Sequence, residues 1–146
     1  MNQYTTLKEK HQEEVNNFPM FFAFSNNQFD DGMKKLGLQP SEIDKVCSIG
    51  CGGYIRKTDG DSMTKMYRRH KKECREAIAN DTTGEGYIYD MFRYELDNHE
   101  YCITCYDGDA LDALGVTHEQ VEADERMIKA LSKAKKDIGD WYRDFG

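Results

Sequence analysis

The pattern of apolar and polar positions along the chain predicts more helix than strand. In segment 61–79, apolar side chains recur every three or four residues, which is the spacing of one helix face. Segments with this spacing, or with a capping residue before a short apolar stretch, are 5–17, 26–36, 61–79, 86–98, 110–114 and 118–142. The last of them begins with a capping box formed by Thr117 and Gln120. Helices therefore make up most of the predicted fold.

Strands are predicted where aromatic and β-branched residues follow one another without helical spacing. The aromatic run at 18–24 predicts a buried strand, and residues 101–106 are rich in strand-forming side chains. Residues 46–49 and 54–56 flank a glycine-rich turn and predict a β-hairpin. These elements predict an α+β fold, a single compact domain over residues 1–146 with a three- to four-stranded, mainly antiparallel sheet packed with several helices.

Composition supports a folded protein with reduced thiols. Of the 146 residues, 38% are hydrophobic and 12% are aromatic, which is enough for a core despite the 32% charged content. The first residues lack the apolar stretch of a signal peptide, and no apolar stretch is long enough to span a membrane. The five cysteines are an odd number without a secretion signal. We therefore expect a cytoplasmic protein with free thiols.

Negative charge is concentrated in one part of the sequence. Residues 81–125 contain thirteen Asp and Glu side chains and one base, Arg93, so this segment carries −12 while the whole chain carries −7. A nucleic-acid backbone is bound by Lys and Arg side chains that replace its counterions, so the acidic balance argues against direct nucleic-acid binding. An acidic surface instead favours a basic protein partner.

Six of these acids are the predicted partner-binding residues. All six lie within the acidic segment, in or beside its predicted helices: Asp90, Asp97, Glu100, Asp107, Asp109 and Asp112. A negative surface of this kind would imitate the phosphates of a nucleic acid and occupy the basic groove of a nuclease or DNA-binding protein. Acids at such positions also cap helices and increase solubility, so only the fold shows which of them face solvent.

The cysteines suggest a second hypothesis of a different class. Cys102 and Cys105 have CxxC spacing, and Cys47, Cys51 and His99 could complete a zinc site or a thiol-dependent active site. A strand over 101–106 would place Cys102 and Cys105 on opposite faces, which favours buried thiols acting as small apolar side chains. We therefore predict no catalytic residue, no metal and no cofactor, with the zinc or thiol enzyme as an alternative.

Three strings of residues carry a resemblance to a known family. They are Phe-Pro-Met-Phe-Phe-Ala-Phe-Ser at 18–25, Gly-Gly-Tyr-Ile-Arg-Lys at 52–57, and Tyr-Glu-Leu-Asp-Asn-His-Glu-Tyr at 94–101. Over most of its length the chain resembles small uncharacterised proteins carried by phages and mobile elements of gut Firmicutes-type bacteria. The resemblance implies no activity or residue role. It implies a genomic context in which small acidic proteins include inhibitors of host defence, anti-CRISPR proteins among them.

These observations predict a binding protein rather than an enzyme. We expect a non-catalytic accessory protein of a phage or mobile element that docks its acidic surface on a basic host protein, such as a CRISPR nuclease or another defence nuclease. A self-associating structural accessory protein, and thus a homo-oligomer, is a further alternative.

Overall fold

The computed structural model describes residues 1–145, which form two compact units. One unit, here called the helical unit, combines Met1–His11 with the chain from Glu73 onward. The other, the sheet unit, is Gln12–Lys72. The boundaries between the units fall inside helices α1 (Gln3–Asn16) and α3 (Gly60–Asn80). The expectation of one domain over residues 1–146 stays a prediction.

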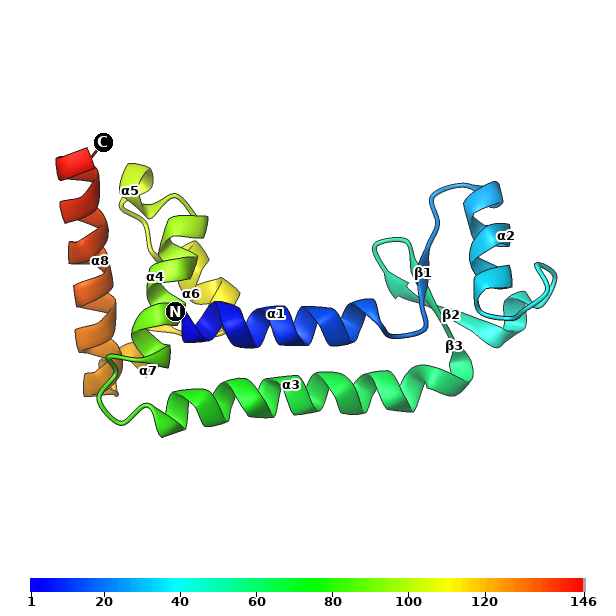
Figure 1. Ribbon diagram of the computed structural model, residues 1–146, viewed down its shortest axis with the longest axis horizontal. Coiled ribbons are helices and arrows are strands. Elements are labelled where there is room, and N and C mark those ends of the chain that lie inside the picture. The colour runs from blue at the N-terminus through cyan, green and yellow to red at the C-terminus, as the bar shows by residue number, and fades with distance from the viewer. Residues whose placement is uncertain (146) are drawn as a thin grey trace. The chain divides into compact units, whose positions relative to one another are not determined.

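The sheet unit contains a small antiparallel sheet. Its strands are β1 (Phe21–Phe22), β2 (Val46–Gly50) and β3 (Gly53–Arg56), in the order β1-β3-β2. Helix α2 (Asn26–Lys35) packs against β1 (Figure 1). The short 3-10 helices η1 (Ile43–Lys45) and η2 (Lys57–Asp59) flank the hairpin of β2 and β3. The sequence-predicted hairpin is therefore confirmed.

The core of the sheet unit is small, and one predicted burial is wrong. The buried residues packed together are Phe21, Met33, Leu36 and Val46. The aromatic run at 18–24 forms only a two-residue strand, and its Phe22 and Phe24 side chains are 55% and 78% exposed. Side chains alternate across a strand, so Phe21 faces the core and its neighbours point away from it.

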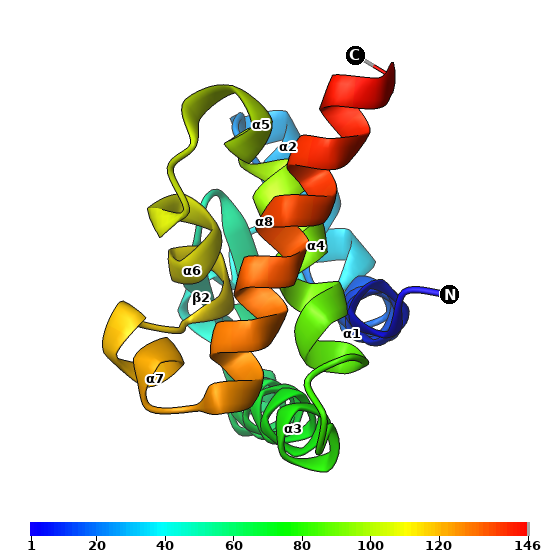
Figure 2. The same ribbon diagram turned by 90° about the vertical axis from the view of Figure 1, so that its left-hand side faces the viewer.

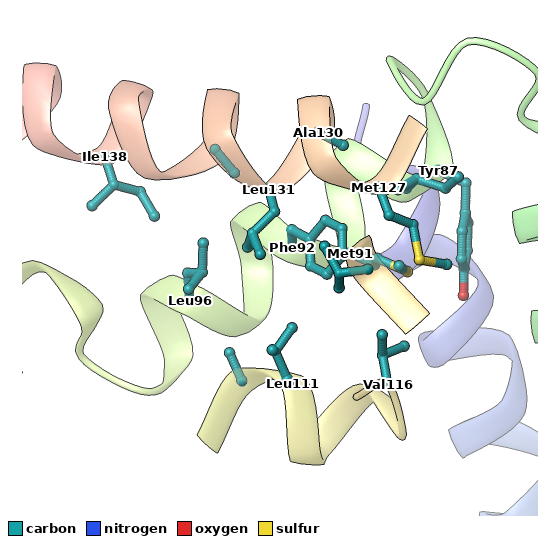
Figure 3. Close-up of a cluster of buried hydrophobic side chains, with 14 residues drawn as sticks. Tyr87, Met91, Phe92, Leu96, Leu111, Val116, Met127, Ala130, Leu131 and Ile138 are labelled. Atoms are coloured by element: carbon teal, nitrogen blue, oxygen red, sulfur yellow. The ribbon is translucent and has the colours of Figure 1, made fainter. Parts of the chain in front are cut away.

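The helical unit is built around α4 (Tyr87–Asn98) and α8 (Glu125–Phe145). These two helices pack against each other, and the shorter α5 (Tyr101–Thr104), α6 (Gly108–Leu114) and α7 (His118–Glu122) lie beside them (Figure 2). Figure 3 shows the side chains of α8 pointing toward α4 and α6. The helix predicted over 86–98 is confirmed as α4, and one of its faces is buried: Ile88, Met91, Phe92, Glu95 and Leu96.

Two predicted elements of the helical unit are wrong. Residues 101–106 do not form a strand, because Tyr101–Thr104 is a helical turn bracketed by Glu100 and Cys105, both with positive φ. No strand of the unit's described residues lies beside it, so only a helical turn satisfies its backbone groups locally. The helix predicted over 118–142 is divided into α7 and α8 where Asp124 accepts the backbone N–H of Arg126.

The fold class agrees with the sequence. The protein is α+β, with a three-stranded antiparallel sheet and a majority of helix. The capping box of Thr117 and Gln120 is present at the start of α7, and Gly115 ends α6 in the left-handed conformation. Within residues 1–145, every helix is too short or too polar to cross a membrane.

Candidate functional site

The two units differ sharply in charge. The helical unit has 19 Asp and Glu residues against 10 Lys and Arg residues, a net −9, whereas the sheet unit has 8 against 10, a net +2. The acidic segment found in the sequence therefore belongs to one folded unit, where its side chains are held by the same set of packed helices. All six predicted partner-binding acids lie in this unit.

Two of the six acids are used inside the protein. The Asp90 carboxylate accepts the backbone N–H of Gln3 at 2.7 Å and so holds the first turn of α1. The Asp107 carboxylate accepts hydrogen bonds from Lys135 at 2.7 Å and His118 at 2.9 Å. Burial alone would raise the pKa of Asp107, but these hydrogen bonds outweigh it and lower the pKa below its usual range. Asp107 is the N-cap residue of α6, but its side chain makes no capping hydrogen bond.

The other four acids lie at the surface. Asp97 is exposed and pairs with Arg93 on the preceding turn of α4, with 3.3 Å between Oδ2 and Nε. Glu100, Asp109 and Asp112 are also exposed. Asp109 and Asp112 are three residues apart on α6, which places them on one side of that helix.

The exposed acids of α6 continue onto α7. Along 108–122 the chain has no Lys or Arg, and its four acids are all exposed. We call these four residues the α6–α7 surface: Asp109, Asp112, Glu119 and Glu122. The two helices follow each other along the same flank of α8 (Figure 2). These four exposed carboxylates have no Lys or Arg between them in the sequence, and they are the strongest candidate for recognition of a basic partner.

The cysteines of the zinc or thiol alternative do not lie on the strand that was expected over 101–106. Cys102 lies in helix α5 and Cys105 ends it, so the argument from a strand, which placed them on opposite faces, does not hold. All five cysteines carry free thiols. Across residues 1–145, however, no three His, Cys, Asp or Glu side chains come together in a group that could hold a metal ion. Residues 1–145 thus offer no ligand set for zinc, and the thiol-dependent enzyme stays an alternative prediction.

Sequence analysis missed the role of a buried carboxylate. Glu95 is 1% exposed in the core of the helical unit. Its Oε1 accepts a hydrogen bond from the Tyr4 hydroxyl at 3.1 Å and lies 3.4 Å from Lys8 Nζ, and its Oε2 lies 3.3 Å from His99 Nε2. Burial, together with the charge and hydrogen bond of Glu95, raises the pKa of Tyr4. The signal in the sequence was an acid on the apolar face of α4.

An open groove in the sheet unit was also missed. Its volume is about 760 Å³, and it lies among the end of α1, strand β1 and helix α2. Exposed Phe22 and Phe24 contribute to its lining, with Asp31 and Lys35 among its polar residues. The polar residues of the groove carry both signs of charge, so it does not share the chemistry of the α6–α7 surface.

By its fold and charge, the protein is a small α+β protein with an acidic helical unit. The chain belongs to a family of unknown function (DUF7659), whose model matches residues 3–137. No curated protein and no solved structure matches it. The family match covers the sheet unit and the helical unit as far as residue 137, including the acidic residues of α4, α6 and α7.

Proposed function

We propose that this protein is a non-catalytic binding protein whose α6–α7 surface docks on a basic protein. The observation that carries the proposal is the run of exposed acids on α6 and α7 within a unit of net charge −9. Such a surface accelerates the encounter with an oppositely charged patch and aligns the two proteins. It disfavours acidic partners through like-charge repulsion.

The partner class follows from the required charge. A groove that binds nucleic acid is lined by Lys and Arg, so a nucleic-acid-binding protein presents the complementary surface. We propose a nuclease as the partner, with a CRISPR or other defence nuclease as the specific case suggested by the resemblance to phage and mobile-element proteins. The protein would then act in the cytoplasm as an inhibitor that competes with nucleic acid.

Charge reversal tests this proposal. The double variant Asp109→Lys/Asp112→Lys changes the net charge by +4 on the α6–α7 surface. Its matched control, Asp30→Lys/Asp61→Lys, makes the same change at exposed acids of the sheet unit. Tagged protein would be exposed to host lysate at low and high salt, captured proteins identified by mass spectrometry, and the binding rates of a purified basic candidate measured.

The expected result is a basic partner lost at high salt, with association slowed by about tenfold or more in the α6–α7 variant. The control should associate at close to the parent rate, because its reversed charges lie in the other unit. Equal binding by all three proteins would contradict the proposal, and so would a partner whose binding is insensitive to salt.

A further inference from the structure

The short helix α5 carries two cysteines in a single turn. Cys102 is its second residue, and Cys105 ends it. The backbone N–H of Cys105 donates to the carbonyl of Tyr101 at 2.8 Å, which closes the turn. Helix geometry over this turn places the Cα atoms of the two cysteines about 5 Å apart. Cα atoms joined by a disulfide are about 4.4–6.8 Å apart, so this spacing is suitable for a disulfide.

The backbone of Cys105 turns its side chain toward Cys102. Its φ of 55° lies in the left-handed region, where helices usually end on glycine, as α6 does at Gly115. With a helical φ at Cys105, the two Cβ atoms would be about 5.6 Å apart. Rotation about the N–Cα bond to the positive φ brings them to about 4.4 Å, and a disulfide needs about 3.5–4.5 Å. The two thiols are thus close enough to bond with only a small movement of the chain.

The two thiols differ in their surroundings. Helix α5 packs against α4 and α8 (Figure 2), and Cys102 is half-buried whereas Cys105 is exposed. A hydrogen bond with Cys102 raises the pKa of Tyr142, so Cys102 lies on the side of α5 that contacts α8. Thiol–disulfide exchange uses an exposed thiol, which meets the incoming disulfide, and a neighbouring thiol, which resolves the mixed disulfide. Cys105 and Cys102 are placed for these two roles.

We propose that the α5 turn makes Cys102 and Cys105 a reversible dithiol–disulfide pair that is oxidised by the disulfide of a small thiol. The Cys105 thiolate attacks one sulfur of that disulfide and expels the other as a thiol, which takes up a proton in place of the one that Cys105 lost. The Cys102 thiolate then attacks Cys105 Sγ, closes the Cys102–Cys105 bond and expels the second thiol, which takes up a proton in the same way. The protein loses two electrons and two protons, and the small disulfide becomes two thiols. This proposal does not depend on the proposed function, since neither cysteine belongs to the α6–α7 surface.

Cys47 and Cys51 of the sheet unit provide an internal control. They match the α5 pair in exposure, since Cys47 is half-buried and Cys51 is exposed, and Cys51 also has a positive φ of 50°. Cys47 lies in the extended strand β2, however, and Gly50 at the end of that strand is three residues further on. This length of strand is about 10 Å, and Cα atoms more than about 7 Å apart form no disulfide without backbone movement. Because Cys51 follows Gly50, we expect this pair to remain open.

Oxidation of the purified full chain in glutathione buffers tests the pair. The ratio of oxidised to reduced glutathione is raised in steps, free thiols are alkylated, and tryptic peptides are analysed by mass spectrometry. Trypsin produces peptides 94–126 and 46–56, each of which contains one of the two cysteine pairs and no other cysteine. Peptide 94–126 should lose two hydrogens and escape alkylation at a ratio about tenfold or more below that required for 46–56.

Two controls show whether the folded turn is responsible. Cys105→Ser and Cys102→Ser should each stop at a mixed disulfide between the remaining thiol and glutathione. In concentrated urea, which unfolds α5, the preference for peptide 94–126 should disappear. Peptide 94–126 that keeps free thiols or only mixed disulfides at every ratio overturns the proposal. An undiminished preference in urea overturns it as well, because the spacing of the cysteines in the sequence would then explain the reaction without the α5 turn.

Discussion

Gly32 of α2 lies so close to the Phe21 ring that no larger residue fits. A Cβ atom there would be 2.1 Å from Phe21 Cδ2 and 2.3 Å from Cγ. Phe21 is 5% exposed and packs against Phe29 and Tyr54, with ring centroids 5.7 and 5.3 Å away. These two rings therefore hold the Phe21 ring in place next to Gly32. The absence of a side chain at Gly32 permits α2 to cover β1.

Substitution of Gly32 by Ala should destabilise the protein. Better helix propensity would stabilise α2 by up to about 1 kcal/mol, but overpacking against Phe21 costs about 1–3 kcal/mol. We expect a net loss of about 1–2 kcal/mol in the free energy of unfolding, measured by urea titration. Gly139→Ala in α8 is the control, because its Cβ meets no atom within 4 Å. It should gain up to about 1 kcal/mol, and equal effects at the two sites would contradict the argument.

At the scale of single residues, the sequence identified the acids but not the hydrogen bonds that they make. The excess of carboxylates over 81–125 was plain, and four of the six selected residues are exposed. The partners of Asp90 and Asp107 are 87 residues away at Gln3 and 28 residues away at Lys135. Periodicity describes neighbours along one helix, so it carries no information about hydrogen bonds between distant elements.

At the scale of the element, Glu95 helps to hold the start of α1 in the helical unit, beside the hydrogen bond of Asp90 to Gln3. No residue of α1 is buried, so the helix has little apolar area with which to dock. Tyr4 and Leu7 pack partly against the core, and Glu95 accepts hydrogen bonds from Tyr4 and Lys8. A carboxylate with several donors keeps the start of α1 in place better than its thin apolar face would alone.

Glu95→Ala should therefore release the start of α1. It leaves the Tyr4 hydroxyl without its acceptor and opens a cavity, and we expect a loss of about 2–4 kcal/mol in the free energy of unfolding. Lys8 keeps its contact with water, which holds the loss below that of a fully buried ion pair. Amide hydrogen exchange along 3–11 should accelerate. Glu95→Gln, which keeps an acceptor for Tyr4, should lose less, and full protection of 3–11 in Glu95→Ala would contradict this role.

The elements were predicted best where a long stripe or a local cap defines them. The stripe of α4, the hairpin of β2 and β3 and the capping box of α7 all follow from neighbouring residues. The short segment 101–106 failed, because strand-forming side chains form a strand only beside another strand. The break between α7 and α8 depends on the Asp124 side chain, which accepts a hydrogen bond from the backbone N–H of Arg126. The residues on either side of this break otherwise follow one continuous helical pattern.

At the scale of the whole molecule, charge segregates between two units that carry −9 and +2. This segregation follows from the sequence only after the unit boundaries are known, because the helical unit joins the first residues to the last half of the chain. The α6–α7 surface lies wholly within the acidic unit, so the charge of that unit favours the approach of a basic partner to it.

The same charges predict how stability depends on pH. Hydrogen bonds from Arg69 and His70 lower the pKa of Glu14 to about 2, and those from Tyr89 and Lys133 lower the pKa of Asp137. The pKa values of Asp107, Asp124 and Asp140 are lowered as well. In the unfolded chain these groups titrate near 4, so between pH of about 4.5 and about 2 the unfolded state binds more protons. Their contribution to stability is complete above that range and is lost as the pH falls through it.

A second effect on stability acts at higher pH. The two effects together predict that stability has a maximum between neutral and acidic pH. Between pH 7 and the isoelectric point near 5.1, the net charge of −7 falls to zero and internal repulsion is relieved. The urea midpoint should therefore rise slightly from pH 7 to about 5 and fall steeply below about 4.5. Glu14→Gln removes one carboxylate of lowered pKa, so its stability should fall less between pH 5 and pH 3 than that of the parent. An identical acid loss in parent and variant would show that Arg69 and His70 do not hold the Glu14 carboxylate in its charged form.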